Sequence, residues 1–375
     1  MWLERFYENT DQFFIKGKVN LLYGPRRVGK TTLVEKLLSK TGKKVFIGNG
    51  DDIQIRKILS SEDQIKILSS FDSYDYIFID EAQRIKNIGW GLKILVDHLH
   101  ECTIIASGSS SFQLSSQVGA PLTGRNRSRR LFPMSILELK DQFGGMIIHQ
   151  NLENYLIYGM YPEVLNQKNN QDKTTYLNEL RNSYLLKDIL ELENIRNSDK
   201  LIDLLRLLAY QIGSEVSLNE LGNSLSLSKH TISKYIDLLE KVFIIKKIRG
   251  YSNNLRKEVS KSSRFYFYDN GIRNAVINNF SPIELRNDIG MLWENFAIME
   301  RFKKQEYHQL YSNNFFWRTY DQKEVDLVEE RDGKLYGFEF KWNPKKAKIQ
   351  QTWLDTYPNA SFEVITRDHI LEFAS

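Results

Sequence analysis

Residues 24–31 read Gly24-Pro-Arg-Arg-Val-Gly-Lys30-Thr31, and this stretch decides the fold of the domain that contains it. An apolar run over 19–23 precedes it, and residues 31–38 follow with the pattern of a helix. Two glycines, then Lys-Thr, between a strand and a helix are typical of a P-loop, which binds the phosphates of a nucleotide. The alternative is a glycine-rich surface turn, which requires neither Lys-Thr nor the two flanking elements.

The chemistry of a P-loop assigns roles to its residues. Glycine lets the backbone turn so that N–H groups face one anion, and the following helix adds the positive end of its dipole. Lys30 is expected to reach the outer phosphates, and the Thr31 hydroxyl to join the shell of a Mg²⁺ ion. We therefore expect ATP and Mg²⁺ as ligands. The loop residues expected to contact them are Gly24, Pro25, Arg26, Arg27, Val28, Gly29, Lys30, Thr31 and Thr32.

A short apolar strand over 75–79 ends in Asp80-Glu81. Carboxylates at the carboxyl end of a buried parallel strand face the ligand crevice of an α/β sheet. Asp80 is therefore the expected second ligand of Mg²⁺, and Glu81 the base that polarises the attacking water. This pattern is common by itself, and it gains weight because it follows a P-loop.

A third strand, over 103–106, leads into Ser107-Gly-Ser-Ser-Ser111. Hydroxyl groups at the end of a strand beside the P-loop are placed to orient water or to sense the last phosphate. Ser107 and Ser109 are the candidates for this role. The alternative is an ordinary Ser/Gly turn.

Length and composition limit the class of protein. A chain of 375 residues predicts two or three domains, and 41% hydrophobic with 26% charged residues is normal for a globular protein. The single cysteine, Cys102, excludes an intramolecular disulfide, and with six histidines it leaves no obvious zinc cluster. No apolar run is long enough to span a membrane, and no signal-peptide order is seen. We expect a cytoplasmic protein without a membrane partner.

The order of elements predicts four domains. A doubly wound parallel α/β core is expected over 1–148, because strands alternate with helices. A helical lid over 149–199, a winged helix-turn-helix over 200–270 and a C-terminal α/β domain over 271–375 follow. A basic segment between the third strand and the lid contains Arg125, the candidate for an arginine contact to nucleotide. Its neighbours Arg127, Arg129 and Arg130 contact phosphates or a neighbouring subunit, or they form a solvated loop.

Residues 217–239 have the pattern of a helix-turn-helix. Ser217 and Glu220 are spaced as a capping box for the first helix, and the second helix carries a polar and basic face. Lys229, His230 and Lys234 on that face are the expected contacts to duplex DNA. Two strands, 242–248 and 264–268, flank a basic connection with Arg249, Arg256, Lys257 and Lys261, which is the expected wing. Such units also bind proteins or serve as scaffolding.

The C-terminal third carries a second group of chemically active residues. Three strands, 315–320, 324–329 and 335–342, place Glu339 and Lys341 on one face, with Asp326 on the neighbouring strand. Converging carboxylates suit Mg²⁺, and a nearby lysine assists a metal-bound water. Metal ligands are thus expected at Asp326 and Glu339, with Glu294 from an upstream helix, and Lys341 is the expected catalytic residue. The alternative is a hairpin with a surface ion pair.

These motifs together resemble a known family. Gly24–Thr31, Phe78–Arg84, Ser107–Ser111, Leu122–Arg125, Phe132–Ser135 and Gly159–Glu163 resemble, in order, the prokaryotic AAA+-type (AAA_14) ATPases with a C-terminal DUF4143 domain. The resemblance implies a P-loop NTPase fold, a winged helix and a restriction-endonuclease-like PD-(D/E)xK domain. On that basis Asp326, Glu339 and Lys341 occupy the nuclease motif, and Glu294 the preceding helical acid.

The sequence therefore predicts an ATPase that couples its nucleotide state to DNA binding and to Mg²⁺-dependent DNA cleavage. Two alternatives stay open. The first is an ATP-gated DNA-binding regulator whose nuclease fold is inactive. The second is an ATPase adaptor whose winged helix binds protein. A homo-oligomer is compatible with all three, and the net charge of +5 suits nucleic acid only weakly.

Overall fold

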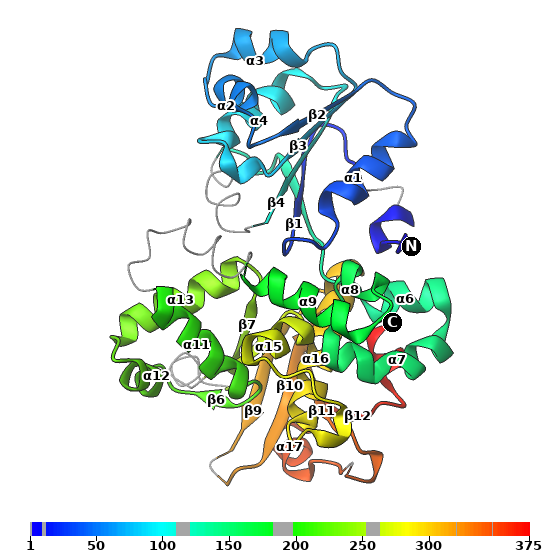
Figure 1. Ribbon diagram of the computed structural model, residues 1–375, viewed down its shortest axis with the longest axis vertical. Coiled ribbons are helices and arrows are strands. Elements are labelled where there is room, and N and C mark those ends of the chain that lie inside the picture. Colours follow the sequence, from blue (N-terminus) through cyan, green and yellow to red (C-terminus); the bar gives the residue numbers. More distant parts are fainter. Residues whose placement is uncertain are drawn as a thin grey trace. The chain divides into compact units, whose positions relative to one another are not determined.

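Figure 1 shows the computed structural model of the chain, which describes residues 2–9, 13–109, 121–182, 198–252, 263–319, 321–346 and 348–375. The chain forms two compact units. The P-loop unit contains Glu4–Pro133 and Lys241–Phe243. The C-terminal unit contains Met1–Leu3, Met134–Glu240 and Ile244–Ser375. Within the described ranges, no helix has the length and apolar character needed to cross a bilayer.

The P-loop unit is built on a parallel sheet of five strands in the order β2-β3-β4-β1-β5. Its strands are β1 (Val19–Tyr23), β2 (Val45–Asn49), β3 (Tyr76–Asp80), β4 (Thr103–Gly108) and β5 (Asn126–Arg130). The strands β1 and β4 are mainly apolar and are buried along their whole length, as is typical of central strands in a parallel sheet covered on both faces. All five strands run in one direction, so their carboxyl ends lie at one edge.

Helices cover both faces of this sheet. They are α1 (Lys30–Ser39), α2 (Ile53–Leu59), α3 (Gln64–Phe71) and α4 (Ile88–His98), with short 3₁₀ helices η1 (Phe6–Asn9) and η2 (Ala82–Arg84). Right-handed crossovers from β1 to β2 and from β2 to β3 run in opposite directions along the sheet, so α1 covers one face and α2 to α4 the other. Figure 1 shows this separation. The predicted α/β fold with a parallel sheet is confirmed.

A sheet of seven strands forms the centre of the C-terminal unit, in the order β12-β11-β10-β9-β7-β8-β6. Its strands are β6 (Glu215–Val216), β7 (Ile245–Gly250), β8 (Ser263–Phe267), β9 (Asn313–Arg318), β10 (Glu324–Arg331), β11 (Lys334–Phe340) and β12 (Ser361–Ile365). The parallel pair β7 and β9 joins the strands near the helix-turn-helix to the C-terminal strands. The segments predicted as 200–270 and 271–375 therefore share one sheet.

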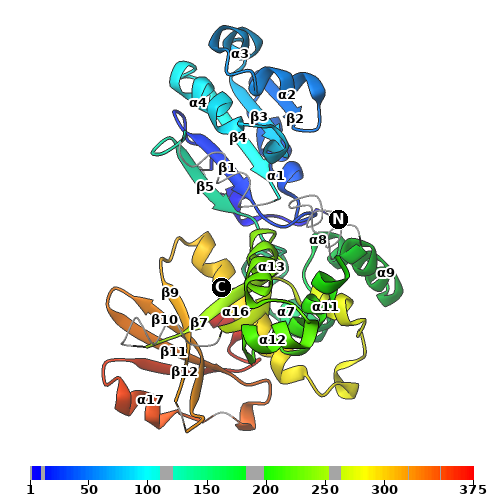
Figure 2. The same cartoon turned by 90° about the vertical axis from the view of Figure 1, so that its left-hand side faces the viewer.

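The helices of this unit pack on that sheet and on one another, as the turned view in Figure 2 helps to follow. They are α6 (Ile136–Phe143), α7 (Gly145–Tyr158), α8 (Pro162–Asn166), α9 (Asn170–Leu180), α11 (Ser198–Tyr210), α12 (Leu218–Leu225), α13 (Lys229–Lys241), α15 (Asn270–Ile277), η4 (Ile283–Leu285), α16 (Ile289–Tyr307), η5 (Pro344–Lys346), α17 (Gln351–Thr356) and α18 (Ile370–Ala374). The long helix α16 is buried around Trp293, which indicates a central position.

The boundary between the units differs from the predicted one. The P-loop unit ends at Pro133, not at residue 148, and α6 already belongs to the C-terminal unit. A capping box of Ser135 and Glu138 starts α6, and the Ile136 N–H donates to the buried carboxylate of Glu300 at 2.6 Å. The segment predicted as a lid of the ATPase core also belongs there, because α7 and α9 pack on α15. Residues 183–197 of that segment lie outside the described residues.

Candidate nucleotide site and the C-terminal carboxylate cluster

The backbone of the predicted P-loop requires glycine. Gly24 has a φ of 152°, and a Cβ atom there would lie 1.9 Å from the carbonyl oxygen of Leu131. Gly29 adopts a left-handed conformation with a φ of 90° directly before α1. Since glycine has no side chain, the first N–H groups of α1 keep no side-chain cap and are available to an anion. The loop therefore has the geometry that phosphate binding needs.

The Lys30 side chain is buried and turned onto the loop. Its Nζ atom donates to the carbonyl oxygens of Gly24 at 2.9 Å and Pro25 at 2.7 Å. Val28 is also buried, whereas Arg27 and Thr32 are exposed and Arg26 is partly buried. The ammonium group is thus held beside the loop that is expected to cradle phosphates.

Arg5 lies outside the motif and forms hydrogen bonds with the backbone of the P-loop and of a neighbouring segment. Its Nη1 atom donates to the carbonyl oxygen of Val28 at 2.6 Å, and its Nη2 atom to that of Phe132 at 2.8 Å. Charged donors make stronger hydrogen bonds than neutral ones, so this buried guanidinium stabilises the loop conformation. Sequence reasoning missed Arg5, because it lies far from the motif along the chain and belongs to no known pattern.

Three oxygen-bearing side chains meet at the carboxyl ends of β1, β3 and β4. The Thr31 hydroxyl donates to Asp80 Oδ2 at 2.7 Å, and the Ser107 hydroxyl donates to Asp80 Oδ1. The parallel register, in which Ile79 pairs with Ala106, explains why Asp80 and Ser107 lie side by side. A hydroxyl and a carboxylate at one point are the ligands that Mg²⁺ prefers, so Thr31 and Asp80 fit this ion.

Glu81 lies beside this group and is held by its neighbours. It has a φ of 47° and precedes η2. The Gln83 amide donates to Glu81 Oε2 and, at 3.2 Å, to the Ser109 hydroxyl, which itself lies 3.4 Å from Glu81 Oε2. Gln83 is buried, and its Oε1 atom has no hydrogen-bond partner among the described residues. The predicted base and Ser109 are thus brought together by Gln83, a residue that sequence reasoning did not select.

Arg125 is not brought to this site. It directly precedes β5 at the amino end of the sheet, where its carbonyl oxygen accepts from the Val19 N–H. The length of β5 separates that end from the P-loop by about 16 Å. The guanidinium pairs instead with Asp97 at 2.6 Å. Arg125 therefore does not lie where it could contact a nucleotide bound to its own chain.

The other arginines of this segment differ from the expected loop. Arg129 is buried and lies over the rings of Tyr7 and Phe13, each at 5.4 Å. Arg130 ends β5 opposite Tyr23 and lies 5.5 Å from the ring of Phe243. A solvated basic loop does not describe these two residues.

The predicted helix-turn-helix consists of α12, a tight turn and α13. The Leu227 N–H donates to the carbonyl oxygen of Gly222 at 2.9 Å, and a Cβ atom at Gly222 would lie 2.7 Å from the Leu227 carbonyl oxygen. The predicted capping box at Ser217 is wrong, because this side chain makes no capping hydrogen bond. Ser228 caps α13 by accepting from the Thr231 N–H at 3.1 Å.

The three predicted DNA contacts, Lys229, His230 and Lys234, are exposed on α13. The residues Ile232 and Ile236 on its other side are buried. Strands β7 and β8 form the antiparallel pair expected for a hairpin. Arg256, Lys257 and Lys261 of the predicted wing lie outside the described residues.

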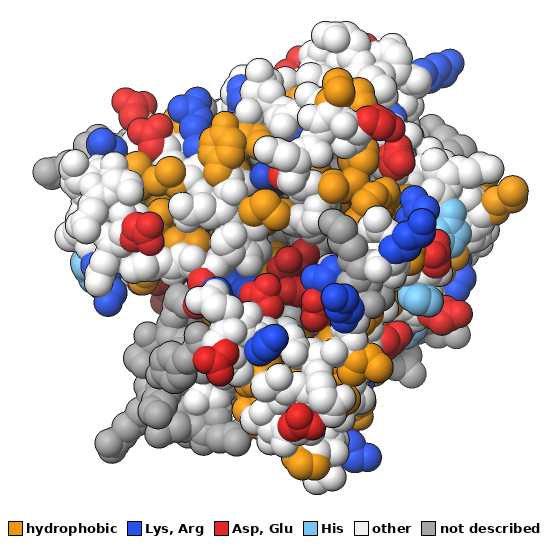
Figure 3. Space-filling model, turned by 90° about the horizontal axis from the view of Figure 1, so that it is seen from below, with side chains coloured by type: hydrophobic (Ala, Val, Ile, Leu, Met, Phe, Trp, Pro, Cys, Tyr) orange, Lys and Arg blue, Asp and Glu red, His pale blue; other side chains and the backbone are white. Residues whose placement is uncertain are grey.

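The C-terminal strands bring the predicted nuclease residues together with an arginine. Leu327 pairs with Phe338 in antiparallel register, so Asp326 comes opposite Glu339. Lys341 Nζ pairs with Glu339 Oε1 at 2.7 Å. The buried guanidinium of Arg264 lies 3.4 Å from Asp326 Oδ1 and 3.7 Å from Glu294 Oε1. One face of the molecule shows acidic side chains beside basic ones in a hollow (Figure 3).

Burial changes the acidity of this cluster. Burial, together with the nearby Asp326, raises the pKa of Glu294 to about 8, although Arg264 opposes the change. Burial also raises the pKa of Asp326 and of Glu339. The pKa of Lys341 is raised, since Asp326 and Glu339 together outweigh the effect of its burial. These shifts reflect carboxylates crowded in a dry environment.

The predicted metal site at Glu294, Asp326 and Glu339 is not supported. In the ranges that the structure describes, no three His, Cys, Asp or Glu side chains gather in a way that could hold a metal ion. Arg264 stands among the carboxylates instead. The sequence offered no signal for this contact, because Arg264 was predicted only as the start of a strand that flanks the wing, and it lies on β8.

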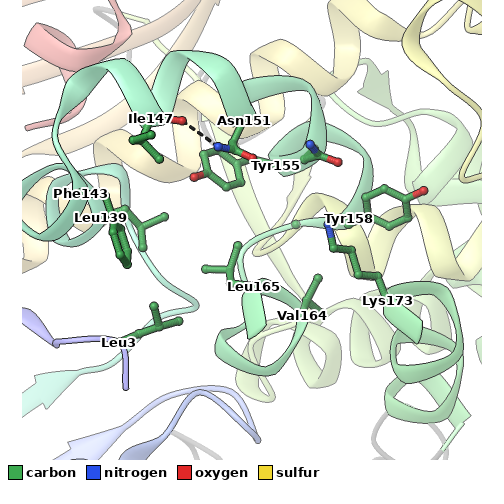
Figure 4. A pocket seen from close by; sticks show the side chains of 12 residues that line it. Leu3, Leu139, Phe143, Ile147, Asn151, Tyr155, Tyr158, Val164, Leu165 and Lys173 are labelled. Atoms are coloured by element: carbon green, nitrogen blue, oxygen red, sulfur yellow. Dashed lines mark hydrogen bonds between the residues drawn. The ribbon is translucent and has the colours of Figure 1, made fainter. Parts of the chain in front are cut away.

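A separate pocket of about 210 Å³ lies among α6, α7, α8 and α9 (Figure 4). Its lining is mainly apolar, and Lys173 Nζ lies 5.2 Å from the ring centre of Tyr158 at one end. Burial lowers the pKa of Lys173. The segment Gly159–Glu163, which is part of the family resemblance, borders this pocket, and Asp269 holds it by accepting from the Met160 N–H at 2.7 Å.

Two family models match the parts of the chain in which the sequence predicts the ATPase core and the C-terminal domain. The family model described as an AAA domain matches residues 16–140, and the domain of unknown function DUF4143 matches residues 289–373. These matches support an AAA-type ATPase domain over residues 16–140 and a DUF4143 domain over residues 289–373. A further domain of unknown function, DUF8612, matches residues 149–282, between the other two.

Similar proteins occur in bacteria and archaea. An uncharacterized protein of Mycobacterium tuberculosis is 26% identical over 87% of this chain and 70% of its own length. An uncharacterized protein of Methanocaldococcus jannaschii is 24% identical over 96% of this chain and 87% of its own length. Among solved structures, a Walker-type ATPase of Pyrococcus abyssi aligns with 69% of this chain and 91% of its own, at 16% identity and a TM-score of 0.46.

Proposed function

We propose that this AAA-type protein binds and hydrolyses ATP and couples its nucleotide state to the binding of duplex DNA. The observation that carries the proposal is the convergence of Lys30, Asp80 and Glu81 at one edge of the parallel sheet. Ligands bind at this edge in open α/β sheets. A phosphate cradle, a pair of oxygen ligands for Mg²⁺ and a base therefore occur together.

The residues have distinct roles in this reaction. Lys30 neutralises the outer phosphates, and the N–H groups at the start of α1 bind them. Thr31 and Asp80 hold Mg²⁺, which neutralises charge on the phosphates when it is bound. Glu81 accepts a proton from the attacking water, and Ser107 fixes the orientation of Asp80.

Contact with DNA is proposed through α13. Its exposed face carries two lysines and a histidine, and the tight turn at Gly222 precedes it. A polar and basic helix of this kind suits the major groove, and the hairpin of β7 and β8 suits a wing. This supports a winged helix that binds duplex DNA.

The chain itself offers a route for coupling. Residues Lys241–Phe243, which end and follow α13, belong to the P-loop unit. Within that unit Phe243 contacts Arg130 at the end of β5, the strand that runs beside β1. A change at the P-loop can thus reach the end of α13 through neighbouring strands.

A second candidate is an ATP-gated DNA-binding regulator whose C-terminal fold does not cut DNA. The observation that favours it is the position of Arg264 among the carboxylates that a nuclease would use for metal. For this candidate function, residues 271–375 have a restriction-endonuclease-like fold but no nuclease activity.

Steady-state ATPase assays on the full chain test the proposal. Lys30→Ala should abolish ATP binding, because it removes the charge beside the phosphates. Glu81→Gln should retain binding but lose turnover, since the amide keeps its shape and accepts no proton. Wild-type protein that binds no ATP would refute the proposal, and equal loss of binding in both variants would remove Glu81 from the role of base.

A further inference from the structure

Arg264 is a deeply buried cation that lies among several carboxylates of the C-terminal unit. Its residue is 3% exposed, and its guanidinium faces carboxylates from two other elements. Its Nη2 atom donates to Glu324 Oε2 at 2.6 Å, and its Nη1 atom lies 3.4 Å from Asp326 on β10 and 3.7 Å from Glu294 on α16. Three carboxyl groups therefore converge on a single cation.

Several carboxylate oxygens of this cluster already have hydrogen-bond or ion-pair partners. Asp326 Oδ2 accepts from the Phe340 N–H at 3.0 Å, and its Oδ1 faces Arg264. Glu294 Oε1 accepts from the Tyr266 hydroxyl at 2.7 Å. A divalent ion would have to displace these donors and would lie next to a buried positive charge. Both requirements oppose metal binding.

Arg264 also connects parts of the unit that are far apart in the sequence. It lies on β8, which pairs with β7 after the helix-turn-helix, whereas Glu324 and Asp326 lie on β10 and Glu294 on α16. A planar guanidinium with five donors can satisfy several carboxylates at once, whereas a lysine cannot match that geometry. The contact of its Cζ atom with the Phe316 ring, at 4.7 Å from the ring centre, fixes it further.

We propose that Arg264 is the resident cation of this cluster, in the position that a divalent metal would take. The cluster joins the hairpin behind the helix-turn-helix to α16 and β10, and it binds no metal while Arg264 is present. It therefore supports no metal-dependent cleavage of DNA. This inference bears on the second candidate function, but it does not depend on ATP binding or on DNA binding.

Mn²⁺ binding to the full chain without nucleotide tests the proposal, with electron paramagnetic resonance to count free ions. Wild-type protein and each variant are compared with the same protein that also carries Asp326→Asn. Any Mn²⁺ bound at the P-loop is then present in both members of a pair and does not affect the difference. Wild-type protein should bind the same amount of Mn²⁺ with and without Asp326→Asn. Arg264→Met should gain one Mn²⁺ per chain, and this gain should disappear when Asp326→Asn is added.

Arg301→Met is the matched control. Arg301 is also a buried arginine of this unit, and it forms a bidentate pair with Glu329 at 2.6 and 3.0 Å. It faces a single carboxylate, so its removal should destabilise the protein without creating a metal site. Circular dichroism confirms that each variant is folded.

Two results would overturn the proposal. The first is Mn²⁺ uptake by the wild-type chain that Asp326→Asn abolishes, which would show a metal site in the presence of Arg264. The second is a folded Arg264→Met variant that gains no Mn²⁺, which would show that the arginine does not occupy a metal position. If the Arg264→Met variant does not fold, the Mn²⁺ binding of wild-type protein with and without Asp326→Asn tests the proposal by itself. Failure of the ATPase proposal would leave all these results unchanged, because no nucleotide is used.

Discussion

The side-chain amide of Gln83 donates a hydrogen bond to the carboxylate of Glu81. The same amide donates to the Ser109 hydroxyl, so the end of β4 and the segment after β3 are tied through one side chain. A carboxylate that acts as a base must be held close to its working position, since small displacements are costly in rate. If Glu81 acts as the proposed base, Gln83 is its positioning residue.

Replacement of Gln83 should affect turnover more than binding. Gln83→Leu keeps the approximate size but removes the donors, so kcat for ATP hydrolysis should fall about ten- to a hundredfold with little change in KM. Ser109→Ala should have a smaller effect, because its contact with Glu81 is long at 3.4 Å. Steady-state kinetics and equilibrium ATP binding separate the two effects. A loss of ATP affinity as large as the loss of kcat would contradict the positioning role.

The close approach at Gly24 gives a second prediction. Gly24→Ala places a methyl group 1.9 Å from the Leu131 carbonyl oxygen, so the loop must move and ATP affinity should fall. We expect at least about a tenfold loss, which corresponds to about 1.4 kcal/mol. The control is Gly17→Ala, which has a φ of 70° and no neighbour within 4 Å. It should lower stability by about 1 kcal/mol and leave ATP affinity unchanged. Equal ATP affinities in both variants would exclude the proposed loop geometry.

Cys102 gives a prediction of pH dependence. Burial raises the pKa of its thiol from 9.0 to about 11, and Asp75 adds to the effect. The reactive thiolate is therefore scarce below pH 11 in the folded chain, whereas the unfolded chain releases the proton near pH 9. A disulfide reagent at pH 8 should modify the unfolded protein at least about tenfold faster than the native protein. Equal rates would mean that this thiol is exposed.

Charge reversal on α13 tests the predicted DNA contacts. Lys229→Glu with Lys234→Glu should weaken duplex binding and flatten its dependence on salt, because fewer counterions are released. The control pair is Lys323→Glu with Lys334→Glu, two exposed lysines directly before β10 and at the start of β11, with the same change in net charge. Fluorescence anisotropy across a salt series measures both. Equal weakening by the two pairs would point to non-specific charge, and no weakening would favour a winged helix that binds protein.

The geometry of the candidate nucleotide site was predictable because the residues that form it belong to local motifs. Gly24, Lys30 and Thr31 occupy one turn between a strand and a helix, and Asp80 follows a continuous apolar strand. Each of these motifs spans about ten residues or fewer, so it can be recognised without knowledge of the tertiary structure. Parallel pairing then brings Asp80 and Ser107 to the same edge without further information. Gln83 follows Asp80-Glu81 closely, but nothing in the sequence distinguishes it from a glutamine that is exposed on the surface.

The C-terminal cluster was only partly predictable for the opposite reason. The alternation along β11 correctly placed Glu339 near Lys341, because a strand has a period of two. The contact of Arg264 with Asp326 joins strands that lie 62 residues apart in the chain. It depends on the pairing of β7 with β9, which no local pattern encodes. The same pairing explains why two predicted domains share one sheet.

The coupling of nucleotide state to DNA binding is the central claim, and one measurement tests it most directly. The affinity of the Glu81→Gln chain for a fluorescent duplex is measured with saturating ATP, with ADP and without nucleotide, since this variant should bind ATP without consuming it. The account predicts an affinity with ATP that differs from the affinity with ADP by at least about fivefold, which is about 1 kcal/mol of coupling. The difference should vanish in the Lys30→Ala chain. The same duplex affinity in all three states, with ATP binding demonstrated in the same sample, would contradict the account.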